Sequence, residues 1–134
     1  MVGRWAPVVA WMAAVFFVSS ISNLGSAGRV PDWISHPVEY GAGAVLVCRA
    51  LAAPRPRPLT ASTAMIATLL TTAYGITDEY HQSFVPGRTA DPADVVKDLV
   101  GAAAASLVYR RWTNAAAMSD RGSTRTPDPS ESPR

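Results

Sequence analysis

The sequence predicts an all-α fold, an integral membrane four-helix bundle with both termini on the cytoplasmic side. Three observations lead to this prediction: four apolar stretches close to membrane-spanning length, prolines and glycines at their ends, and an uneven distribution of arginine. Of the 134 residues, 49% are hydrophobic and 16% are charged, which is less charge than the roughly 25% of soluble domains. The mean hydropathy of +0.11 is low for a membrane protein, because polar residues at 77–98 and in the C-terminal tail lower the average.

The apolar stretches define the domain. We predict one transmembrane domain, residues 1–113, with helices at about 5–22, 37–53, 59–76 and 93–112. Each is near the length a bilayer requires, which is about 20 mostly apolar residues with about 17 as the lower limit. The first and third carry no charge, whereas the second carries Glu39 and Arg49 near its ends. The fourth spans only if Lys97 and Asp98 lie within its first turns.

Local signals at the helix ends support these boundaries. Pro37 suits the first position of a helix, which makes His36 the predicted N-cap of the second helix. Prolines within 54–58 predict a stiff connector. Pro86–Gly87 predicts the centre of a type II turn, since glycine tolerates the positive φ required there. Asp91–Pro92 predicts the N-cap and first residue of the fourth helix.

The two ends of the chain differ in composition: the C-terminal end is polar and the N-terminal end is apolar. Residues 114–134, rich in serine, proline, threonine and charge from Ser119 onward, are predicted to be a disordered cytoplasmic tail. The first stretch could alternatively be a cleaved signal peptide, because Arg4 precedes it and Gly25-Ser26-Ala27 follows it. Its apolar core is longer than the usual 7–15 residues. The single cysteine, Cys48, excludes an intrachain disulfide.

The basic residues indicate the orientation. With four helices and both termini on one side, that side holds nine of the 12 lysines and arginines: Arg4, Arg49, Arg55, Arg57, Arg110, Arg111, Arg121, Arg125 and Arg134. The other side holds three, Arg29, Arg88 and Lys97, together with most of the acids. Cytoplasmic loops collect lysine and arginine, so the 77–98 segment is predicted to be extracytoplasmic. No basic stripe with interleaved aromatics is present, so nucleic-acid binding is not expected, and membrane lipids are the expected partners.

Ionisable residues are expected to meet at the outer mouth of the bundle. Helical spacing puts His36, Glu39, Tyr40 and Gly43 on one stripe, and Asp94, Lys97, Asp98 and Gly101 on another. A carboxylate without a partner at membrane depth costs several kcal/mol, so the acids need neighbours. The glycines of these stripes would allow the helix backbones to approach closely beneath the cluster.

The cluster supplies the candidate site residues. His81 with Asp78 or Glu79 could form a base and its orienting partner. Arg88 could either hold an anionic substrate or pair with Asp94 or Asp98. The predicted substrate-binding set is Arg88, His36, Glu39, Tyr40, Gln82, Asp94 and Asp98. Two histidines and several carboxylates could hold Zn²⁺ or Mn²⁺, but their spacing matches no strong signature, so no metal and no cofactor is expected.

Four motifs follow one another along the chain. They are Trp5-x-Pro7 with Ser19-Ser20, Asp32-x-x-x-His36-x-x-Glu39-Tyr40, Asp78-Glu79-x-His81-Gln82-x-Phe84-Val85-Pro86-Gly87-Arg88, and Asp94-Val95-x-x-Asp98-x-x-Gly101. In this order they resemble the VanZ-like family of small bacterial membrane proteins, over most of residues 5 to 110. Trp33 stands where that family usually has a lysine. The resemblance implies a role in the cell envelope, and the family's namesake is associated with low-level resistance to the glycopeptide teicoplanin.

The predicted function is that of a multi-pass cell-membrane protein whose outer polar cluster binds or modifies a lipid-linked cell-wall component or a glycopeptide. Whether it is an enzyme is left open. A proton-coupled carrier, in which Asp98, Glu39 and His81 titrate, is one alternative. A scaffold whose charges only pin the helices together is the other. The sequence does not predict the oligomeric state.

Overall fold

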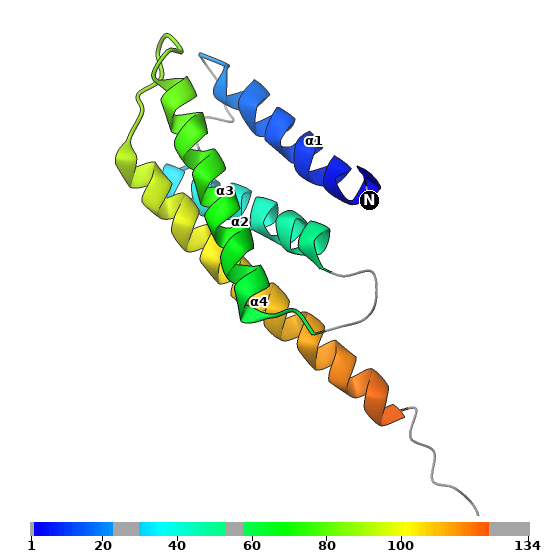
Figure 1. The fold of residues 1–134 in the computed structure, drawn as a ribbon. Coiled ribbons are helices and arrows are strands. Elements are labelled where there is room, and N and C mark those ends of the chain that lie inside the picture. The colour runs from blue at the N-terminus through cyan, green and yellow to red at the C-terminus, as the bar shows by residue number, and fades with distance from the viewer. Residues whose placement is uncertain (1, 23–29, 53–57, 124–134) are drawn as a thin grey trace, which may run out of the picture.

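The computed structural model describes residues 2–22, 30–52 and 58–123. Four helices account for nearly all of them: α1 (Val2–Ser19), α2 (Asp32–Leu51), α3 (Ala61–Gln82) and α4 (Pro92–Ser123) (Figure 1). The predicted all-α fold of four helices is therefore confirmed. The glycine–serine–alanine sequence considered as a cleavage site and most of the proline-rich connector lie outside the described residues.

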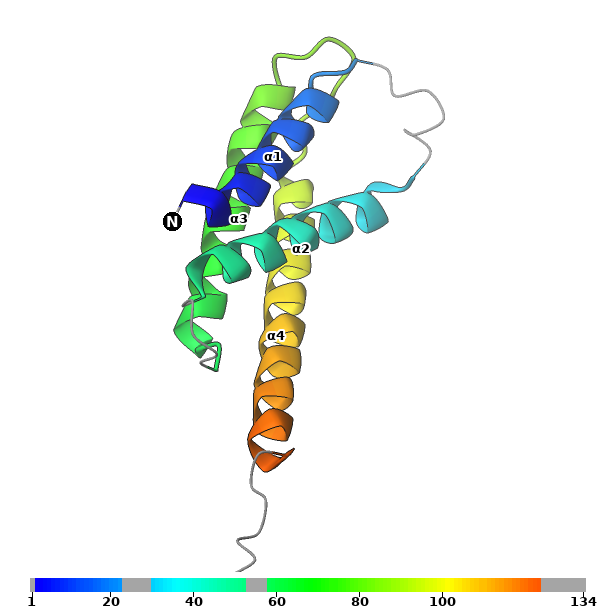
Figure 2. The ribbon, with the colours of Figure 1, turned by 90° about the vertical axis from the view of Figure 1, so that its right-hand side faces the viewer.

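Helix α2 is the element that joins the bundle. It packs most extensively on α4 and also contacts α1 and α3. Helices α3 and α4 run antiparallel, while α2 crosses them obliquely and α1 lies along α3 (Figure 2). The start of α2, the end of α3 and the start of α4 therefore converge, and this end of the bundle holds the candidate site.

Glycines allow α2 and α4 to touch through their backbones. A Cβ added to Gly101 would lie 2.2 Å from the carbonyl oxygen of Pro37, and one added to Gly41 would lie 3.3 Å from the carbonyl oxygen of Gly101. A Cβ on Gly43 would lie 2.4 Å from the ring of Trp11. The close backbone approach expected at Gly101 is therefore present, whereas Gly43 makes room for the Trp11 side chain of α1.

Helix α2 begins earlier than predicted. Pro31 is its N-cap residue, and the Pro31 carbonyl accepts hydrogen bonds from the amides of Ile34 and Ser35. The acid Asp32 in the first turn suits the positive end of the helix dipole. The prediction of His36 as the N-cap is therefore wrong, and both His36 and Pro37 lie inside the helix.

Helices α3 and α4 end later than predicted. Helix α3 continues from 76 to Gln82, so Asp78, Glu79 and His81 are helical and not part of a loop. Helix α4 continues to Ser123, so residues 114–123 of the predicted disordered tail are helical. Residues 124–134 lie outside the part of the chain that is described.

The connection between α3 and α4 follows the prediction closely. Gly87 has a φ of 81°, and the Arg88 amide donates to the Val85 carbonyl at 3.1 Å. Helix α4 begins at Pro92, and the Asp91 carboxylate accepts a hydrogen bond from the Ala93 amide at 2.8 Å. The turn and the N-cap that positions Asp94 are therefore confirmed.

The interior changes character along the bundle. One end has an apolar core made of Val8, Val47, Cys48, Ala50, Leu59, Ala64 and Ala67. The other end buries Asp78, Glu79, Gln82, Asp94 and Asp98. Large apolar side chains meanwhile face outward, including Phe17 at 69% exposure, Leu69 at 58% and Val108 at 67%. Four acids lie inside this end while many large hydrophobic residues face outward, which is the reverse of the usual distribution in a soluble domain.

Membrane insertion is not established by the fold. Within the described ranges, none of the helices has both the length and the apolar character required to cross a bilayer. Insertion and the side on which the termini lie remain predictions.

Candidate functional site

A histidine–carboxylate pair connects α2 to α4. His36 Nδ1 lies 2.9 Å from Asp98 Oδ1, and His36 Nε2 lies 3.5 Å from Asp94 Oδ2. Asp98 has no exposed surface, and Asp94 is 7% exposed. The predicted stripes on α2 and α4 are thus brought together. Asp98 faces Nδ1 of the imidazole, and Asp94 faces Nε2.

Helix α3 contributes a second group of acids. The Gln82 amide nitrogen donates to Asp78 Oδ2 at 2.9 Å and to Glu79 Oε1 at 3.3 Å. Glu79 Oε2 accepts the Asp91 amide at 2.9 Å, which ties the end of α3 to the start of α4. The amide nitrogen of Gln82, a residue predicted to bind substrate, is therefore taken up by two acids of its own helix.

Gly75 of α3, which no sequence pattern singled out, leaves the space that the Asp98 carboxylate occupies. A Cβ on Gly75 would lie 2.6 Å from Asp98 Oδ2 and 3.1 Å from the Tyr40 ring. Tyr40 is 1% exposed, and its ring stacks with His36 at a centroid distance of 6.2 Å. Tyr40 therefore packs against the His36 ring and helps to fix its orientation. Gly75 is required because a larger residue would displace the carboxylate.

The positive side chains of the site differ in their partners. Lys97 forms an ion pair with Asp94 Oδ1. Arg88 forms no salt bridge within the described part of the chain, so the predicted pairing with Asp94 or Asp98 is not present there. Its Nε atom is buried and has no hydrogen-bond partner among the described residues. Among the residues that the structure describes, Arg88 is consequently the cation of this region that remains available to an external anion.

His81 belongs to a different contact. Its Nε2 lies 3.0 Å from the Ser20 hydroxyl, and its ring stacks on Phe16 at 4.3 Å. The Ser20 hydroxyl donates to the Phe16 carbonyl at 2.6 Å, so it accepts from His81 and is not activated as a nucleophile. His81 joins α3 to α1. Within the described residues its side chain makes no hydrogen bond to Asp78 or Glu79.

The pKa values of His36 and Glu79, which lie outside the predicted membrane spans, reflect the excess of negative charge in the cluster. Burial lowers the pKa of His36, but the hydrogen bond to Asp98 and the charges of Asp98, Asp94 and Glu79 outweigh it, so the net pKa is raised. Burial raises the pKa of Glu79, the Asp91 amide opposes this, and the charge of Asp94 raises it further. Both groups bind protons more tightly than usual, as expected where negative charge is in excess.

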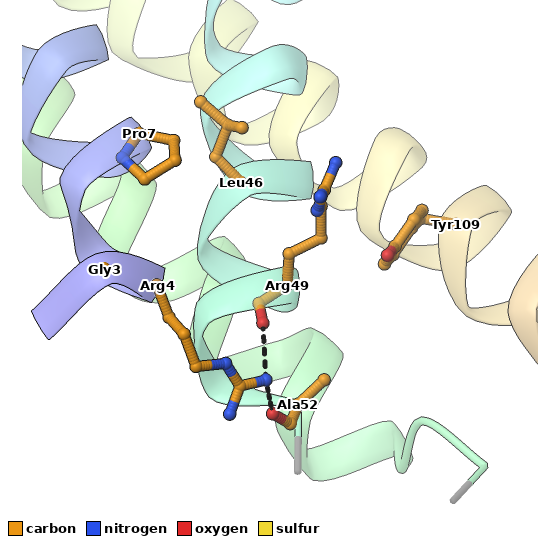
Figure 3. A pocket seen from close by; sticks show the side chains of 7 residues that line it. All are labelled: Gly3, Arg4, Pro7, Leu46, Arg49, Ala52 and Tyr109. Carbon is orange, nitrogen blue, oxygen red and sulfur yellow. Dashed lines mark hydrogen bonds between the residues drawn. The ribbon is translucent and has the colours of Figure 1, made fainter. Parts of the chain in front are cut away.

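A hollow lies at the opposite end of α2 from the histidine–carboxylate cluster. Its volume is about 420 Å³, and it is lined by Gly3, Arg4, Pro7, Leu46, Arg49, Ala52 and Tyr109. The Arg4 guanidinium donates to the carbonyl of Arg49 at 3.0 Å and to that of Ala52 (Figure 3). Arg4 thereby satisfies carbonyls at the C-terminal end of α2, where a positive charge also suits the helix dipole. This contact is structural and fixes α1 on α2.

The comparisons with known proteins give one match. The family model described as VanZ/LLP1 matches residues 5–113, which is most of the chain. None of the curated proteins and none of the solved structures matches it. The matched region contains every residue of the cluster.

Proposed function

Since this chain belongs to the VanZ-like family, we propose that it is a multi-pass protein of the cell membrane whose outer polar cluster binds an anionic, lipid-linked cell-wall component. Arg88 holds the phosphate of that component. If the bound component is also modified, His36 and Glu79, whose pKa values are raised, would be the groups that exchange protons in the metal-free protein. Engagement of such a component would reduce the access of a glycopeptide such as teicoplanin to the membrane surface.

The membrane location is supported by the inverted distribution of side chains. Phe17, Leu69 and Val108 are each more than half exposed, whereas Asp98 is fully buried. In water the exposed apolar surface would be unfavourable, at roughly 25 cal/mol per Å². In lipid it is favourable, and polar residues then belong inside the bundle. The acids that lower the hydropathy of the single helices are the ones that the neighbouring helices cover.

We expect the α3–α4 turn to be accessible only from outside the cell. Cysteines introduced one at a time by Ser83→Cys and Ala90→Cys should react with a membrane-impermeant maleimide on intact cells, because basic residues gather at the other end of the bundle. A cysteine at Met118, which is 75% exposed near the end of α4, should react only after the membrane is opened. The native Cys48 has no exposed surface. The parent protein should therefore not be labelled, and it serves as the negative control. Labelling of Met118→Cys on intact cells would contradict the proposed orientation.

The anionic ligand is inferred from Arg88. A buried guanidinium nitrogen without a partner is costly, and a phosphate can accept two parallel hydrogen bonds from arginine. The phosphate or pyrophosphate of a lipid-linked precursor fits this requirement, with its isoprenoid chain lying along the apolar outer surface. The scaffold alternative instead requires Arg88 to be used inside the protein.

Arg88→Gln should weaken binding of undecaprenyl phosphate by at least about tenfold, which is the loss of roughly 1.4 kcal/mol. Binding is measured by titration of the purified protein in detergent, with uncharged undecaprenol as the ligand control. Arg49→Gln, the same substitution at the opposite end of α2, should bind like the wild type. Equal affinity of wild type and Arg88→Gln for the phosphate would remove this function and favour the scaffold.

A further inference from the structure

One group of side chains in the cluster has the arrangement of a metal site, although none was expected from the sequence. His36 from α2, Glu79 from α3 and Asp94 from α4 each present one ligand atom, and these atoms lie within 4.8 Å of one another. We propose that they bind a divalent cation of the Mn²⁺ or Zn²⁺ type. The proposal goes beyond the lipid-binding function and requires neither lipid nor membrane insertion.

The orientation of His36 is the first argument. Asp98 Oδ1 accepts from Nδ1 of the imidazole at 2.9 Å, which leaves Nε2 to face Asp94 Oδ2 at 3.5 Å. Histidines that bind metals almost always give their other ring nitrogen to a carboxylate or carbonyl, which fixes the tautomer. Asp98 is therefore the positioning residue of this site, and a neutral imidazole that donates from Nδ1 would have the lone pair of Nε2 free for a cation.

The second argument is the balance of buried charge. Asp78, Glu79, Asp94 and Asp98 are all less than 10% exposed. Lys97 is the ion-pair partner of Asp94, and one oxygen of Asp98 and one of Asp78 have no hydrogen-bond partner within the described chain. Buried carboxylates need compensating charge. A divalent cation supplies two positive charges where the protein provides few.

The type of cation follows from the ligands. One imidazole nitrogen and two carboxylate oxygens suit Zn²⁺ and Mn²⁺, whereas Mg²⁺ and Ca²⁺ prefer oxygen alone. Ligand atoms bound at about 2.1 Å lie roughly 3–4 Å apart, so small rotations of the carboxylates must draw them inward from their present spread. Three protein ligands leave positions for water or for an oxygen of an anionic ligand.

The test is metal binding by the purified full chain in detergent, without lipid, after removal of metals with EDTA. We expect about one Mn²⁺ per chain, seen as loss of the free Mn²⁺ signal in electron paramagnetic resonance and by elemental analysis. His36→Gln and Glu79→Gln should each lower the affinity at least about tenfold. His81→Gln is the matched control, because it removes the other histidine of the chain without touching the cluster.

A second readout separates binding from misfolding. Mn²⁺ should raise the unfolding temperature of the wild type and of His81→Gln, but not that of His36→Gln, because only a bound ion stabilises the folded state. Asp98→Asn should bind Mn²⁺ more weakly than the wild type while its own metal-free stability is largely kept.

The outcomes decide whether a metal ion or a protonated His36 balances the charge of the buried carboxylates. Binding by wild type at no more than the level of His36→Gln would overturn the site and leave a protonated His36 as the bridge between Asp94 and Asp98. Arg88→Gln should keep its metal. Loss of lipid binding with metal retained, or the converse, therefore shows which of the two proposals has failed.

Discussion

Replacing Gly101 with alanine should destabilise the protein by about 3 kcal/mol, the upper end of what extra volume costs in a packed interior. The new methyl group would lie 2.2 Å from the carbonyl oxygen of Pro37 and 2.4 Å from its Cα. Both atoms belong to the backbone, so no side chain can rotate away, and α2 must move off α4. Thermal unfolding of the purified protein in detergent measures the change.

The same substitution at Gly3 provides the control. A Cβ there would have nothing within 4 Å, and alanine favours a helix over glycine by up to about 1 kcal/mol. Gly3→Ala should therefore keep or slightly raise the unfolding temperature. If Gly101→Ala unfolded no earlier than Gly3→Ala, the close crossing of α2 and α4 would be wrong.

Asp98→Ala should destabilise the protein by about 3–5 kcal/mol, the usual effect of removing one partner from a buried ion pair. Asp98 has no exposed surface, and its carboxylate is the hydrogen-bond partner of His36. Without it, the Nδ1 proton of the imidazole is left in a closed interior and a cavity forms beside Tyr40. Denaturant titration gives the free energy of unfolding.

Two further variants show whether the effect belongs to this position. Asp98→Asn keeps an oxygen that can accept from His36, so it should lose much less stability than Asp98→Ala. Asp120→Ala makes the same change in an exposed part of α4 and should alter stability by less than about 0.5 kcal/mol. A stabilised Asp98→Ala would mean that repulsion between Asp94 and Asp98 outweighs the pairing with His36.

Much of the fold follows from local rules that hold here. The four helices, the φ of Gly87 and the Asp91 cap depend on neighbours in the sequence, and short-range chemistry is enough to predict them. The start of α2 was misplaced because two prolines, Pro31 and Pro37, both suit a helix N-terminus. The second is accommodated inside α2 where Gly101 offers room on the facing helix, which a single helix cannot reveal.

The site was only partly predictable for the same reason. Helical spacing grouped His36 into one stripe and Asp94 and Asp98 into another, and topology brought the two stripes to the same end of the bundle. The contact of His36 with Asp98 and Asp94 was not itself predicted. The end of α3 was set too early because charge was taken to end a helix, yet Asp78 and Glu79 are buried in the bundle at 5% and 7% exposure. His81 was assigned to Asp78 or Glu79, but side chains two apart on a helix do not face each other, which rules out Glu79. Asp78 has suitable spacing, but it accepts from Gln82, while His81 contacts Ser20 of the α1 end. Gly75 gave no signal at all, since its role is the volume that it leaves free.

The bond between His36 and Asp98 joins residues that are 62 positions apart. A ribosome adding roughly 5–20 residues per second releases α2 several seconds before it completes the start of α4. During that interval the histidine has no counter-ion, so α2 is expected to stay loosely held until the last helix arrives. A nascent chain that stops before α4 should therefore be degraded faster than the full chain, because the partner of His36 is in the last helix to be made.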